Sequence, residues 1–156
     1  GALFGPVRDS LLSAYSWSFA TGQVALPKLE TPPVADFVNA FQLPSDFLRA
    51  LSAGTGGRGR GVRFRIARNA LHSDVENVLF TYIFRPEEEE FPPYFDTALI
   101  ARLAAELTIP LTENTSRAEA MYRLAEKEFE QARQIDAQQD TPSRIEDFSL
   151  INARQS

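Results

Sequence analysis

One short stretch of the chain carries the residue types of a hydrolytic triad. His72, Ser73 and Asp74 are consecutive, and His72 is the only histidine among the 156 residues. Neighbouring residues cannot place a base, a nucleophile and an orienting carboxylate in one hydrogen-bonded line, so we interpret Asn69 to Asp74 as a surface turn. The chain has no cysteine, which excludes thiol catalysis and cysteine-ligated zinc. We therefore expect no enzyme: no catalytic residue, no metal and no cofactor.

A glycine-rich segment, Gly54 to Gly61, resembles a phosphate-binding loop in composition. It lacks the Gly-Lys-Ser/Thr ending of such loops and leads into a predicted strand instead of a helix. A flexible hairpin loop is therefore the favoured interpretation. Arg58 and Arg60 within it are candidates for contact with a nucleic-acid backbone or an acidic partner.

Charge is unevenly distributed along the chain. The net charge of −5 argues against general nucleic-acid affinity, yet six arginines and no acid lie between Arg49 and Arg68. Adjacent acids of an extended segment point to opposite sides and do not have the spacing of a calcium loop, so we expect the four acids from Glu87 to Glu90 to be solvated. Separate basic and acidic segments suit contacts between unlike surfaces. The candidate contacts with other subunits or with the tail are Arg58, Arg60, Arg63, Arg65, Glu87, Glu88, Glu89 and Glu90.

The strongest structural signal is an apolar helix predicted at about 92–108, bounded by prolines on both sides. Leucines and a phenylalanine recur every fourth position, and alanines fill most of the remaining circumference, which is typical of a buried helix. The run is shorter than the roughly 20 apolar residues of a membrane span and contains Arg102 and Glu106, so we expect no membrane association. Asp96, Arg102 and Glu106 are expected to form ion pairs with neighbouring elements.

The remaining elements follow from periodicity. We predict helices at about 6–15 and 116–139 and an extended segment at Ser16 to Thr21, with Trp17 and Phe19 on one face. Predicted strands are Ala40–Leu43, Phe47–Ser52, Val62–Arg68 and Val78–Phe84, the last two as partners.

Together these elements predict a single α+β domain over 1–156. We expect a helical bundle around a buried central helix, with a small antiparallel β-sheet inserted at about 17–84 and an extended C-terminal arm at 141–156. The expected core residues are Trp17, Phe19, Phe95, Leu99, Leu103, Leu107, Met121 and Phe129.

The C-terminal arm carries four apolar side chains, Ile145, Phe148, Leu150 and Ile151, without a folding pattern of its own. Such residues need a surface to cover them. Two alternatives are open: the arm packs on its own long helix, or it grips a partner.

A series of short motifs resembles the tail tubular protein A family, the head-to-tail adaptor or gatekeeper proteins of short-tailed phages. The motifs are Val7-Arg-Asp-Ser-Leu-Leu12, Trp17-Ser-Phe-Ala20, Phe41-Gln-Leu-Pro-Ser-Asp46, Phe80-Thr-Tyr-Ile-Phe84, the Phe95–Leu107 run and Ala132-Arg-Gln-Ile-Asp-Ala137. Their order and spacing match over almost the whole chain.

The resemblance implies a virion protein of the tail or neck, assembled in the host cytoplasm. It implies a ring of this chain, expected to hold twelve copies, between the portal protein and the tail tube or nozzle protein, with DNA passing through its channel. It further implies that the helical side faces the portal, that the β side faces the tail, and that the arm residues Ile145, Phe148, Leu150 and Ile151 bind the portal. Two departures from the family are visible. The helical hairpin expected before Val7 is missing or truncated, so we expect a fragment or a trimmed product, and Gly54–Gly61 is unusually rich in glycine and arginine.

Two other functions remain open at this point. One is a nucleic-acid-binding module that uses the Arg58–Arg68 segment. Salt-dependent binding to DNA would support it. The other is a small regulatory domain of a cellular complex. A stable monomer that does not bind a portal would support it.

Overall fold

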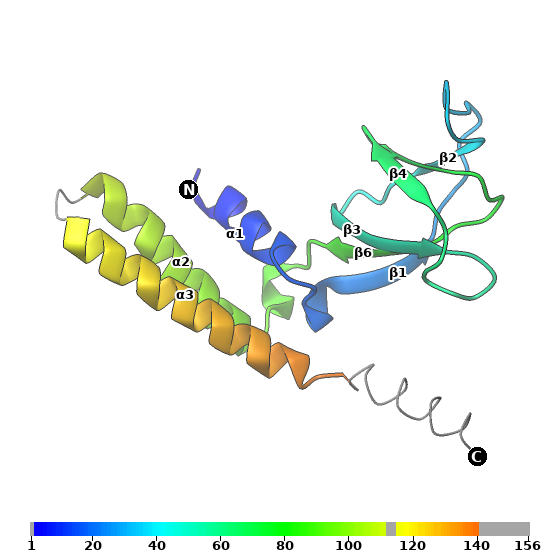
Figure 1. Ribbon diagram of the computed structural model, residues 1–156. Helices are drawn as coiled ribbons and strands as arrows, with labels where there is room; N and C mark the ends of the chain where they lie inside the picture. Colours follow the sequence, from blue (N-terminus) through cyan, green and yellow to red (C-terminus); the bar gives the residue numbers. More distant parts are fainter. Residues whose placement is uncertain (1, 112–114, 141–156) are drawn as a thin grey trace, which may run out of the picture. The chain divides into compact units, whose positions relative to one another are not determined.

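The computed structural model describes residues 2–111 and 115–140 (Figure 1). It divides the chain into two compact units, Gly1–Pro92 and Pro93–Ser156. The first unit holds the strands and one helix, and the second holds two long helices.

The first unit begins with a helix and continues with short strands. Its elements are α1 (Phe4–Ser13), the 3₁₀ turn η1 (Ser18–Ala20), β1 (Thr21–Ala25), β2 (Asn39–Gln42), β3 (Phe47–Gly54), β4 (Phe64–Ala67), β5 (Ala70–Ser73), β6 (Leu79–Phe84) and the 3₁₀ turn η2 (Glu88–Glu90). The described strands form two antiparallel sheets of three strands each, with the orders β1-β6-β3 (sheet A) and β2-β5-β4 (sheet B).

Both sheets contribute to one apolar core. Because side chains alternate across a strand, β6 places Phe80 and Tyr82 on the same face, where their rings stack at 5.3 Å. Phe47 of β3 stacks on Phe80 at 5.9 Å. The buried members of this core come from both sheets and from the segments beside them: Leu26, Phe41, Leu43, Ala53, Leu71, Val78, Phe80 and Tyr82.

Helix α1 buries one face and is held at its C-terminal end. Leu11 and Leu12 are buried, and the indole N–H of the fully buried Trp17 donates to the Leu11 carbonyl at 3.0 Å. The Arg49 guanidinium donates to the Ser13 carbonyl at 2.6 Å, which places a positive charge at the negative end of the helix dipole. The chain leaving α1 is thereby fixed before it enters β1.

The second unit is a helical hairpin of α2 (Pro93–Leu111) and α3 (Thr115–Ala137), which pack along each other. The Tyr94 hydroxyl donates to the buried Asp136 carboxylate at 2.6 Å and so joins the beginning of α2 to the end of α3. Most buried apolar residues here are alanines, which let two helices approach closely: Phe95, Ala98, Leu99, Ala105, Ala125 and Ala132. No helix in the described part of the chain is long and apolar enough to cross a membrane.

The predicted fold class, an α+β helical bundle around a buried central helix, is wrong. The structure is a small α+β fold with two three-stranded sheets dominating the N-terminal half, and it is not a helical bundle around a central helix. The prediction failed because the apolar character of α2 comes largely from alanine, which needs little covering, while most of the largest fully buried side chains lie in the first unit: Leu12, Trp17, Phe41, Leu71, Phe80 and Ile83.

The sequence predicted the positions of several strands but not which strands pair with each other. The segments at Val62–Arg68 and Val78–Phe84 are not partners, because β4 pairs with β5 and β6 pairs with β1 and β3. The predicted turn Asn69–Asp74 is also wrong, since Ala70–Ser73 forms β5. The actual turn needs only two residues, Arg68 and Asn69, and Arg68 adopts the left-handed conformation with φ 57°.

Candidate functional site

The predicted triad residues do not form a catalytic arrangement. His72 and Ser73 lie in β5, and the Ser73 hydroxyl is buried and donates to the Arg63 carbonyl at 3.0 Å. The His72 ring lies 6.5 Å from the ring of Phe37. In residues 2–111 and 115–140, no three His, Cys, Asp or Glu side chains are grouped so that they could hold a metal ion.

Two of the candidate arginines are engaged within the chain. Arg63 pairs with Asp74 at 3.6 Å, and Arg65 pairs with Asp36 at 2.9 Å. Both guanidinium groups also lie over the Phe37 ring, at 4.4 and 5.1 Å from its centre. The Arg65 guanidinium holds the pKa of Asp36 below its ordinary value. These arginines therefore help to fix the loop before β2 on sheet B.

The other two candidate arginines flank a glycine that is tied to sheet A. The carbonyl oxygen of Gly59 accepts hydrogen bonds from the Ser52 hydroxyl at 2.6 Å and from the Thr81 hydroxyl at 3.3 Å. A Cβ at this position would meet the Gln23 amide and lie 2.8 Å from the Thr81 oxygen, so a larger residue would have to displace these side chains. The glycine-rich loop after β3 is thus attached to sheet A at Gly59.

Between this loop and sheet A lies an open hollow of about 330 Å³, which we call the arginine hollow. It is lined by Gln23, Ser52, Arg58, Gly59, Arg60 and Thr81. Both hydroxyl groups donate to Gly59, so the free donors of the hollow are chiefly the exposed guanidinium groups of Arg58 and Arg60. In the described part of the chain neither arginine forms an ion pair. The hollow offers paired N–H donors suited to a carboxylate or a phosphate.

The four acids from Glu87 to Glu90, which we call the acidic turn, form an ordered element. The Glu87 and Glu90 side chains cap each other's backbone N–H groups in a capping box around η2. Pro86 and Phe91 on either side are buried, and the Phe91 ring contacts Phe19 at 6.2 Å. All four acids are exposed, and Glu88 and Glu89 are the two whose carboxylates take no part in the capping box.

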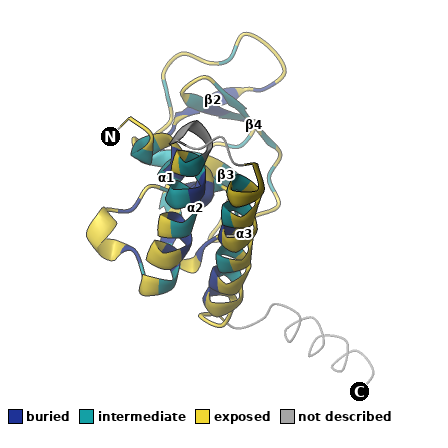
Figure 2. Cartoon of the chain, turned by 90° about the vertical axis from the view of Figure 1, so that its left-hand side faces the viewer, coloured by how far each residue is buried: buried dark blue, intermediate teal, exposed yellow. Residues whose placement is uncertain are grey.

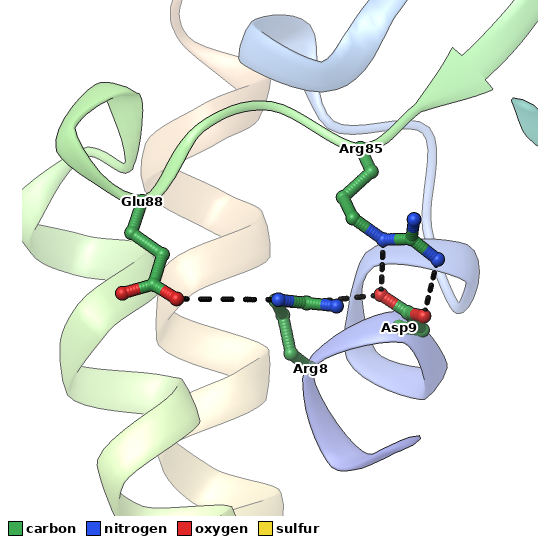
Figure 3. A network of polar contacts seen from close by, with 4 residues as sticks. All are labelled: Arg8, Asp9, Arg85 and Glu88. Atoms are coloured by element: carbon green, nitrogen blue, oxygen red, sulfur yellow. Dashed lines mark hydrogen bonds and ion pairs between the residues drawn. The ribbon is translucent and has the colours of Figure 1, made fainter. Parts of the chain in front are cut away.

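An ion-pair network holds the chain where it enters the acidic turn (Figure 3). Arg85 donates two hydrogen bonds to Asp9 of α1, at 2.9 and 2.6 Å, and Arg8 donates to the same carboxylate at 3.0 Å. The hydrogen bond from Arg85 is the main reason that the pKa of Asp9 lies below its ordinary value. Arg8 also lies 4.0 Å from Glu88. Sequence reasoning missed this network because no local pattern links residues 76 positions apart.

The helical hairpin exposes large apolar side chains on both helices, and we call these four residues the hairpin stripes. Ile100 and Leu107 are seven residues apart on α2, and Leu124 and Ile135 are eleven apart on α3, so each pair shares one side of its helix. Their exposed fractions are 66%, 48%, 46% and 43%. Figure 2 shows exposed residues along the length of α3. Leu107 was expected in the core and lies at the surface.

The other expected core residues differ in burial. Trp17, Phe95 and Leu99 are buried, whereas Phe19, Leu103, Met121 and Phe129 are partly exposed. Arg102 pairs with Glu106 on its own helix at 3.1 Å rather than with a neighbouring element, and Asp96 is exposed. The predicted portal-binding residues of the arm, Ile145, Phe148, Leu150 and Ile151, lie outside the described residues.

The chain matches no protein-family model, and a search of curated proteins also gives no match.

Proposed function

We propose that this protein is a structural subunit of a phage head-to-tail adaptor, forming a ring between the portal protein and the tail. The proposal starts from the ordered series of motifs that resembles the tail tubular protein A family, from Trp17-Ser-Phe-Ala20 to Ala132-Arg-Gln-Ile-Asp-Ala137. The described geometry adds independent support, because its distinctive features are surfaces for contact.

The hairpin stripes are the observation that carries the proposal. Large aliphatic side chains exposed singly are normal on any protein, but here two pairs recur along two helices whose buried residues are mostly alanine. A hairpin with small residues inside and larger ones outside is suited to packing between other copies and a partner. The proposed orientation follows the resemblance, with the helical unit toward the portal and the β unit toward the tail.

The test is assembly on the portal protein of the phage that encodes this chain. We expect the purified full-length protein to bind portal rings with a fixed stoichiometry in native mass spectrometry. The variant Ile100→Glu/Leu107→Glu should lose this binding. The control Ala120→Glu/Gln131→Glu adds the same charge at exposed positions of α3 and should bind normally. A wild-type chain that stays monomeric and does not bind the portal would refute the adaptor function and would favour the regulatory-domain alternative.

The nucleic-acid alternative gains no support from the described contacts. Two of the arginines assigned to it, Arg63 and Arg65, are engaged with Asp74 and Asp36. It stays a prediction whose test is salt-dependent binding of a short DNA duplex by the isolated chain.

A further inference from the structure

We propose that the arginine hollow of one copy receives the acidic turn of a second copy. This inference rests on the proposed ring and names the contact that joins its neighbours. A closed ring of identical subunits needs two different, complementary patches on each subunit. The arginine hollow and the acidic turn have opposite charge, and hydrogen bonds within the first unit hold the backbone of each.

The two patches follow opposite ends of sheet A. Gly54, after which the glycine-rich loop begins, pairs with Leu79 at the start of β6, whereas Phe47 pairs with Phe84 at its end. The acidic turn follows that second end, beyond Arg85. No ion pair joins the two patches within the described chain. Arg58, Arg60 and Glu89 form no ion pair in the described part of the chain, so both patches keep groups that a partner can bind.

The chemistry of the hollow fits carboxylates. Its hydroxyl groups already donate to Gly59, so an incoming group would be bound by the guanidinium groups of Arg58 and Arg60. A guanidinium group binds a carboxylate through two parallel N–H donors. On the acidic turn, Glu87 and Glu90 are occupied in capping, which leaves Glu88 and Glu89 as the outward carboxylates, with Glu88 also 4.0 Å from Arg8.

A phosphate polymer would use the same guanidinium donors as a carboxylate, but the charges of this chain favour a second copy. The chain has a net charge of −5, and nucleic-acid binding usually draws on several phosphate contacts. Here only two arginines line the hollow, and the chain itself supplies an acidic element of opposite charge.

The first experiment reverses the charge of the hollow. Ring formation by full-length protein on the portal is followed by native mass spectrometry at low ionic strength, where surface charge contacts are least screened. Arg58→Glu/Arg60→Glu should weaken association of neighbouring copies roughly tenfold or more. Arg68→Glu/Arg123→Glu, an equal charge change at exposed residues that belong to neither patch, should assemble normally.

The second experiment restores the pairing between different chains. Glu88→Arg/Glu89→Arg alone should also fail to assemble. Mixed with Arg58→Glu/Arg60→Glu, it should recover rings in which the two variants alternate, because every junction then joins opposite charges. Recovery also shows that both variants are folded.

The outcomes separate the two proposals. If wild-type protein forms rings and the hollow variant forms them equally well, the contact assigned here is wrong while the adaptor function stands. If wild-type protein forms no ring, both are wrong. If the hollow variant keeps its rings but loses binding to a short DNA duplex, the hollow is a nucleic-acid site and the inference is overturned.

Discussion

The Asp9–Arg85 pair should contribute measurably to the stability of the first unit. The two hydrogen bonds between them are 2.9 and 2.6 Å long, and the exposed fractions of the side chains are 28% and 40%. Fully exposed ion pairs contribute about 0.2–1 kcal/mol, and two-point contact with partial burial raises this value. We expect a coupling energy of about 1–2 kcal/mol between Asp9→Ala and Arg85→Ala in a double-mutant cycle.

The measurement is urea unfolding followed by the fluorescence of Trp17. The chain has one tryptophan, which is fully buried in the first unit, so the signal reports on the unit that contains the pair. The matched control is the Arg63–Asp74 cycle, whose partners are 3.6 Å apart with exposed fractions of 71% and 52%. That coupling should stay below about 0.5 kcal/mol. Equal coupling energies in the two cycles would refute the reasoning.

The same pair predicts a pH dependence. The pKa of Asp9 is lower in the folded state than its ordinary value of 3.8, chiefly because Arg85 donates to it. The ionised carboxylate is therefore favoured by folding, and its contribution is complete above the unfolded pKa and lost as the pH falls through the folded pKa. The stability difference between wild type and Asp9→Ala should be constant near neutrality and shrink below about pH 4. A difference that grows on acidification would contradict the assignment.

In each unit, a pair of substitutions tests the packing. Leu99→Ala should destabilise the hairpin by about 2–5 kcal/mol in helical circular dichroism, and Leu103→Ala should cost less because Leu103 is only partly buried; equal costs would contradict this burial. Gly54→Ala should destabilise the first unit more than Gly56→Ala. The Cβ added at Gly54 would collide with the Arg58 carbonyl. Gly56 faces open space, so alanine there costs only the strain of the left-handed conformation, about 1–2 kcal/mol.

Local sequence signals located most elements of this fold. Apolar periodicity predicted helices at about 92–108 and 116–139, and the structure has them at Pro93–Leu111 and Thr115–Ala137. The expectation that Pro110 ends the first helix is wrong, because α2 continues to Leu111. Strict alternation located β4, and β-branched and aromatic content located β6. Alternation defines the faces of a strand but not its neighbour, so the pairing of β6 with β1 and β3 was not predictable from it. The turn at Arg68 carried no glycine to reveal it.

The candidate site was only partly predictable, because contacts between residues far apart in the sequence leave no local pattern. The arginines between Arg49 and Arg68 are plain in the sequence, but which of them remain available depends on distant partners. Arg65 pairs with Asp36, 29 positions away, and Ser52 and Thr81 fix the loop that carries Arg58. Only the folded chain separates the engaged arginines from the others.

The alanine-lined hairpin has a consequence for how the second unit folds. Small buried residues remove little apolar surface from water, so the pairing of α2 with α3 gains less than a leucine-lined pair would. Any partner that covers Ile100, Leu107, Leu124 or Ile135 binds the folded hairpin and not the unfolded chain, and it therefore shifts the folding equilibrium by mass action. If that partner is another copy of the chain, as we propose, the melting temperature of this unit should rise with protein concentration, while that of an independently folded domain would not. The stability of this unit would then depend on its assembly.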